Sequence, residues 1–180
     1  MKAFVISILA AALLALGTIA AACGGGDELT LEKYFEQAQV ISDESDEEFE
    51  ALYADFPDED DEEFFSNEEN LTVIKDFAAG FPVIFSDTLN DVEALDPPAE
   101  VEDAHDEFLA AGRDLATLYE GLTSSVEEAE SVSEAEVLFG TGEEDPEIEE
   151  ADQRFMDACL ALEGIAQDNG IHVDFECADE

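Results

Sequence analysis

Apolar residues recur at three- and four-residue steps along most of the chain after residue 29, which is the spacing of amphipathic helices. The first helix is predicted to begin near Thr30 and to end at Pro57. Ser42 and Ser45 interrupt its apolar stripe, so we expect weak packing at that point. The stripe consists of Leu31, Tyr34, Phe35, Ala38, Ile41, Phe49, Leu52, Tyr53 and Phe56.

A second helix is predicted from Ser66, because Ser66-x-x-Glu69 has the form of a capping box. Pro82 lies inside this helix. Because proline lacks an amide hydrogen and clashes with the preceding turn, we expect a kink or a short break near Gly80. The apolar face consists of Leu71, Ile74, Ala78, Phe81, Phe85, Leu89, Val92 and Leu95.

The third predicted helix opens at Asp96-Pro97-Pro98 and fades between residues 127 and 133, and residues 138–142 are predicted to form a loop. A fourth helix begins with Asp145 as its cap and Pro146 as its first residue, and ends at Asn169-Gly170. Residues 171–177 then leave as an extended segment. Four amphipathic helices with short connections predict an all-α fold, an antiparallel bundle of about four helices with a short extended C-terminal tail.

The N-terminal residues have a different pattern. Residues 3–22 contain no charge and follow Lys2, an arrangement typical of a secretory signal segment. An uncleaved transmembrane helix is the alternative, since about 20 apolar residues can cross a bilayer. Both interpretations place the acidic remainder of the chain outside the cytoplasm, facing outward.

The three alanines before Cys23 resemble the lipobox of bacterial lipoproteins, in which the cysteine becomes the lipidated first residue of the mature chain. The resemblance implies a signal peptide at residues 1–22, a lipidated Cys23 with a glycine-rich tether at residues 23–28, and an acidic helical ectodomain at residues 29–180. The expected location is the outer side of the cell membrane, held by the lipid anchor.

Acidic residues dominate the composition, with 50 Asp and Glu against 5 Lys and Arg and a net charge of −45. This charge excludes nucleic acid as a partner, because phosphate recognition depends on Lys and Arg. The 46% of hydrophobic residues, which include 13 Phe, nevertheless predicts a folded chain. The acidity indicates either adaptation to a saline environment or a surface that attracts cations. Because the acidic residues are spread along the chain, adaptation to a saline environment is favoured.

Few residues are candidates for binding a ligand. Glu102-x-x-His105 has the spacing of iron ligands in ferritin-like bundles, but the chain lacks a second such motif, so a single histidine–carboxylate metal site is the hypothesis. Alternatively, His105 lies on the apolar face and hydrogen-bonds a neighbour. Three phenylalanines four residues apart line a ligand groove or belong to the core: Phe77, Phe81 and Phe85.

An acidic loop is predicted at residues 57–66. Its carboxylates are candidate ligands for Ca²⁺, although the loop lacks the glycine turn of an EF-hand. They belong to Asp58, Glu59, Asp60, Asp61, Glu62 and Glu63. The sequence predicts no cofactor and no catalytic residue, because the common catalytic motifs are missing from it.

Cys159 and Cys177 form an even pair once Cys23 is assigned to the anchor, and an exported protein lies in an oxidising compartment. At about 3.3 Å per residue, the extended tail can retrace the last three turns of the fourth helix. The tail then brings Cys177 to Cys159, so we expect a disulfide between them.

Three further stretches resemble small uncharacterised bacterial lipoproteins with helical ectodomains: residues 96–108, 159–162 and 169–177. This resemblance implies an exported helical domain and adds no catalytic residue. We expect a membrane-anchored extracytoplasmic lipoprotein that acts as a non-catalytic binding or structural module. The alternative is an extracytoplasmic protein that binds calcium or a transition metal, and a cell-envelope hydrolase ranks third. The expected partners are the membrane, through the lipid anchor, and, in the alternative, divalent cations.

Overall fold

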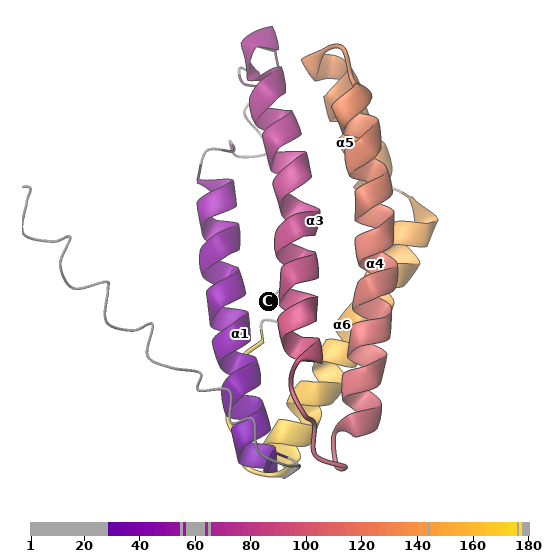
Figure 1. Cartoon of the computed structure of the whole chain (residues 1–180). Helices are drawn as coiled ribbons and strands as arrows, with labels where there is room; N and C mark the ends of the chain where they lie inside the picture. Colours follow the sequence, from indigo (N-terminus) through magenta and orange to yellow (C-terminus); the bar gives the residue numbers. More distant parts are fainter. Residues whose placement is uncertain are drawn as a thin grey trace, which may run out of the picture.

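The computed structural model describes residues 29–54, 56, 64, 66–143, 145–175 and 177 (Figure 1). These residues form five α-helices and one short 3₁₀ helix, and they contain no β-strand. The all-α prediction is confirmed, with one helix more than the four expected. The predicted signal peptide, Cys23 and the tether lie outside the described residues.

Four long helices make up the bundle: α1 (Leu31–Tyr53), α3 (Leu71–Glu93), α4 (Glu102–Glu128) and α6 (Pro146–Asp168). They run alternately up and down in Figure 1, and each packs on its neighbour in this order. The shorter α5 (Val132–Glu143) packs mainly on α4 and α3, and the 3₁₀ helix η1 (Glu68–Asn70) leads into α3. The described helices therefore form an antiparallel bundle.

The ends of α1 and α6 follow the sequence signals. The Thr30 side chain caps α1 by accepting a hydrogen bond from the Lys33 amide at 3.4 Å, and Asp145 caps α6 by accepting from the Glu147 amide at 2.8 Å. At the other end of α6, Gly170 has φ of 72°, and the Ile171 amide donates to the Ala166 carbonyl at 2.9 Å. This is the Schellman arrangement, which a glycine accepts at low cost.

Two predicted boundaries are wrong. The helix α1 ends at Tyr53, before Pro57 is reached. At the start of the second helical segment, Asn67 rather than Ser66 is the cap, and its side chain accepts from the Glu69 amide at 3.1 Å. An asparagine side chain two residues before the amide makes this bond as readily as a serine would, so the first residue of the motif was misassigned.

Of the kink or short break predicted near Gly80, the break is absent, since α3 is helical throughout with Pro82 buried inside it. Proline cannot donate to the carbonyl four residues earlier, which belongs to Ala78. In the structure the hydroxyl of Thr123, on α4, donates to that carbonyl oxygen at 2.7 Å. The neighbouring helix thus supplies the hydrogen bond that the proline removes, and the helix remains continuous.

The predicted loop at residues 138–142 is helical, because α5 extends from Val132 to Glu143. Its first turn is capped from two directions. The Ser131 hydroxyl accepts from the Glu134 amide at 3.2 Å, and the Glu134 carboxylate accepts from the Glu130 amide at 2.8 Å. In addition, Glu68 accepts from the Val132 amide at 3.1 Å. These bonds satisfy amides that a helix start leaves free.

The buried side chains form three clusters along the bundle. The lower cluster contains Tyr34, Phe35, Val101, Leu162 and Ala166; the middle one Leu89, Val92, Leu109 and Ala116; and the upper one Ile74, Ala78, Val126, Ala129, Val132 and Ala135. At Gly112 a Cβ atom would lie 2.5 Å from a methyl group of Leu89, so the glycine lets α4 approach α3 closely. All three clusters lie within residues 29–177. A chain of residues 24–180 therefore retains all of the described core.

The described residues of the C-terminal tail, 171–175 and 177, lie between α1 and α6, two helices that share few close contacts in the described structure. The amide of Gln39 on α1 bonds both backbone groups of Asp174, donating to the carbonyl at 2.8 Å and accepting from the N–H at 2.7 Å. On the other side the Phe175 amide donates to Glu163 of α6 at 2.9 Å. The predicted disulfide between Cys159 and Cys177 is present, with the Cα atoms 5.6 Å apart. The tail therefore joins α1 to α6.

The Thr123 hydrogen bond can be tested by a double-mutant cycle. Thr123→Val should lower the free energy of unfolding by about 1–3 kcal/mol, because the Ala78 carbonyl loses its donor in a buried place. In the Pro82→Ala background the same substitution should cost much less, because residue 82 then has an amide hydrogen for that carbonyl. Urea denaturation at constant salt measures each difference.

Thr117→Val is the matched control, because the Thr117 hydroxyl donates to a carbonyl of its own helix, that of Arg113, at an exposed position. It should change stability by less than about 0.5 kcal/mol. An equal cost for Thr123→Val with and without Pro82 would show that the hydroxyl does not replace the missing helix bond.

Candidate functional site

A cavity of about 180 Å³ lies between α1, α3, α4, α6 and the tail, and we call it the lower cavity. Its lining is mainly apolar and includes both cysteines of the disulfide. The lining residues are Tyr34, Ala38, Ile41, Ser42, Ser45, Asp46, Phe49, Phe85, Thr88, Val92, Phe108, Phe155, Met156, Cys159, Leu162, Phe175 and Cys177. Residues from five separate segments thus line one apolar space that is open to solvent on one side.

The cavity lies where the sequence predicted weak packing of the first helix. Ser42 and Ser45, which interrupt the apolar stripe of α1, both line it, and this prediction is confirmed. The hydroxyls of Ser45 and Thr88 are 2.8 Å apart and join α1 to α3 by a hydrogen bond. A serine fills less volume than a leucine would at the same place, and so part of the space between the helices stays open.

Phenylalanine rings that contact one another form part of the cavity wall. The Phe155 ring lies 5.2 Å from the Phe85 ring, edge to face, and 4.9 Å from the Phe108 ring. Phe49 also lines the cavity and contacts Phe81 at 5.2 Å. Aromatic side chains have few rotatable bonds, and edge-to-face pairs hold one another in place, so these walls are well suited to keep a cavity open.

A second cavity of about 240 Å³, the upper cavity, is enclosed by the upper part of the bundle. Its lining residues are Tyr53, Phe77, Ala78, Phe81, Pro82, Tyr119, Leu122, Thr123, Phe139 and Ile148. Of the three phenylalanines for which the sequence predicted a groove or a core position, Phe77 and Phe81 line this cavity and Phe85 lines the lower one. All three are half-buried, so they serve both as packing and as cavity wall.

His105 is buried, and its Nδ1 is 3.0 Å from the hydroxyl of Tyr34. Burial lowers the pKa of His105, while the negative charges of Asp106 and Glu93 act in the opposite direction. Burial also raises the pKa of Tyr34 to about 12. The pair is therefore a hydrogen bond between two neutral groups in the lower core, as the second of the two hypotheses for His105 predicted.

The metal-site hypothesis gains no support from the described residues. Glu102 is exposed in the first turn of α4, whereas the Nδ1 atom of His105 bonds Tyr34. Within the described ranges, no three His, Cys, Asp or Glu side chains converge as metal ligands. The other candidates, residues 58–63, lie outside the described residues, as does Cys23.

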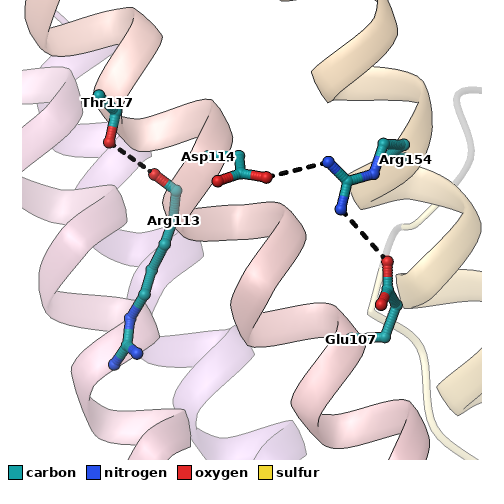
Figure 2. Close-up of polar contacts among 5 residues, drawn as sticks. All are labelled: Glu107, Arg113, Asp114, Thr117 and Arg154. Atoms are coloured by element: carbon teal, nitrogen blue, oxygen red, sulfur yellow. Dashed lines mark hydrogen bonds and ion pairs between the residues drawn. The ribbon is translucent and has the colours of Figure 1, made fainter.

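Three basic side chains of the bundle are engaged with other parts of it. Arg154 on α6 donates to Asp114 at 2.9 Å and to Glu107 at 3.3 Å, both on α4, as Figure 2 shows. Arg113 pairs with Glu93 of α3. Lys75 donates to the carbonyls of Glu127 and Ala129 at the end of α4, at 2.8 and 2.7 Å. None of these three cations lines the lower cavity.

No protein-family model, curated protein or solved structure matches this chain. None of the helices in the described part of the chain combines the length and the apolar content that a membrane span requires.

The buried His105 predicts a loss of stability in mild acid. Its pKa is lowered in the folded chain, so the unfolded chain binds more protons, and the free energy of unfolding falls as the pH drops below about 6.5. The slope from this residue is at most about 1.4 kcal/mol per pH unit. Urea denaturation between pH 7.5 and 5 should show this loss relative to His105→Asn, which keeps a polar partner for Tyr34 but does not titrate. Parallel curves for the two proteins would contradict the assignment.

Proposed function

We propose that this chain is a membrane-anchored extracytoplasmic lipoprotein whose helical bundle binds a small apolar ligand in the lower cavity, without catalysis. The observation that carries the proposal is the cavity itself, an aromatic-walled apolar space between α1 and α6. Binding sites for small molecules are typically concave, mainly apolar and preformed, and they often lie between the helices of bundles.

The position of the cavity supports a binding role. α1 and α6 share few close contacts in the described structure, so the space that the tail leaves unfilled between them takes up a ligand without the separation of two tightly packed helices. The cavity volume of about 180 Å³ is comparable to that of engineered cavities that accept benzene. The tail closes the space on one side through Phe175 and Cys177.

The anchoring part of the proposal comes from the sequence. The uncharged N-terminal segment, the alanines before Cys23 and the glycines after it support export and lipidation. The net charge of −45 is repelled by anionic lipid, so the bundle would stand away from the membrane surface, with the cavity accessible from the solution. The alternative, a cation-binding protein, now depends on residues 58–63.

Ligand binding can be tested with a small neutral probe, tert-butylbenzene, titrated into the segment 24–180 and followed by backbone NMR shifts. The shifts should saturate. Ser42→Leu should weaken binding about tenfold, because the larger side chain occupies the lower cavity. Ser124→Leu is the control, since Ser124 is exposed on α4 and lines neither cavity. Equal affinities of the two variants would place the probe elsewhere and contradict the proposed site.

Anchoring has its own test. Cys23→Ala in the full chain should leave an uncleaved precursor without added lipid, because the residue that accepts the lipid is gone. Intact-mass measurement of the membrane fraction from a bacterial expression host distinguishes the two products. A mature mass unchanged by the substitution would reject the lipoprotein assignment, while leaving the cavity binding untouched.

A further inference from the structure

The mouth of the lower cavity is acidic. Asp46 of α1 lines the cavity and is also exposed, which places its carboxylate at the rim. The negative charges of three other carboxylates repel the Asp46 carboxylate, and they belong to Asp43, Glu50 and Asp174. Partial burial, together with these negative charges, raises the pKa of Asp46. The ionised rim would therefore be stabilised by a positive charge at this place.

Within the described structure, the residues that line this cavity include no Lys or Arg. Arg113, Arg154 and Lys75 bond groups on other helices, as described above. The lining thus combines one carboxylate, that of Asp46, with an apolar interior.

The interior suits an organic cation better than a metal ion. Calcium takes six to eight oxygen ligands, and the lining supplies mostly carbon. The rings of Phe49, Phe85, Phe108 and Phe155 instead offer apolar surface and negative ring faces, which attract ammonium groups within about 6 Å. The charge of −45 also raises the local concentration of any cation near the surface.

We infer that the ligand of the lower cavity is a lipophilic organic cation, an amine or quaternary ammonium compound, whose apolar body lies among the phenylalanine rings and whose charge lies at Asp46. This inference rests on the proposed function and adds the ligand class to it. Asp46 then selects for the positive charge, and the rings provide most of the contact area.

The test compares two compounds of the same shape, phenyltrimethylammonium and tert-butylbenzene, which differ in charge. Each is titrated into the segment 24–180 in about 1 M KCl, where the Debye length is about 3 Å and diffuse attraction is screened. Backbone NMR shifts report affinity and location. We expect shifts around the lower cavity and about tenfold tighter binding of the cation.

Two variants separate the rim carboxylate from the general field. Asp46→Asn should weaken binding of phenyltrimethylammonium severalfold, because the ring faces remain and the carboxylate is lost, and it should leave binding of tert-butylbenzene unchanged. Glu47→Gln removes the same charge from the next residue, which is exposed and lines neither cavity, and should change neither affinity.

The outcomes distinguish the inference from the proposed function. Equal binding of the two compounds would overturn the inference and leave an apolar site. Binding of neither compound would overturn both. Equal losses of cation binding in Asp46→Asn and Glu47→Gln would show that the overall field, and not Asp46, attracts the cation, which also overturns the inference.

Discussion

The structure depends most on the contact that the C-terminal tail makes between α1 and α6. In a closed four-helix bundle these two helices would pack directly on each other. Here the tail lies between them, bonded to Gln39 on one side and to Glu163 and Cys159 on the other. The Gln39 amide pairs with both backbone groups of Asp174, as a neighbouring strand would, so an extended segment is satisfied without a sheet. Part of the space between α1, α6 and the tail remains open as the lower cavity.

Polar side chains do much of the joining between helices in this acidic chain. Arg154 and Arg113 each connect two helices, and Lys75 satisfies carbonyls at the end of α4. Each exposed ion pair contributes about 0–1 kcal/mol to the free energy of unfolding. The main effect of these pairs is to place a positive charge between neighbouring carboxylates and so reduce their repulsion. Thr123 has a different role, because it supplies the hydrogen bond that Pro82 removes from α3. The bundle is thus fixed by directed bonds as well as by its three apolar clusters.

Local signals were predictable from the sequence, and arrangements between helices were not. The helix start near Thr30, the Asp145 cap, the Gly170 terminus and the disulfide are predictable because each depends on residues close in sequence or on one simple distance. The sequence predicts a loop at residues 138–142 where α5 is helical, although Ser131-x-x-Glu134 carries a capping motif. The break expected at Pro82 is absent because the hydrogen bond that replaces the missing one comes from Thr123 on another helix. Of the lower cavity, the sequence indicated the weak packing at Ser42 and Ser45 and a groove or core position for Phe85. The positions of Asp46 and Phe155 depend on which helices face each other.

The most direct test of this account is native-state hydrogen exchange, resolved by mass spectrometry, on the segment 24–180 with and without the disulfide. The comparison uses a chain carrying both Cys159→Ala and Cys177→Ala. The account predicts that loss of the disulfide releases the tail and lowers protection chiefly in α1, while α3, α4 and α6 keep theirs because they pack on one another. A uniform loss of protection across all four helices, or unchanged protection of α1, would contradict the claim that the tail holds α1 in place of direct packing on α6.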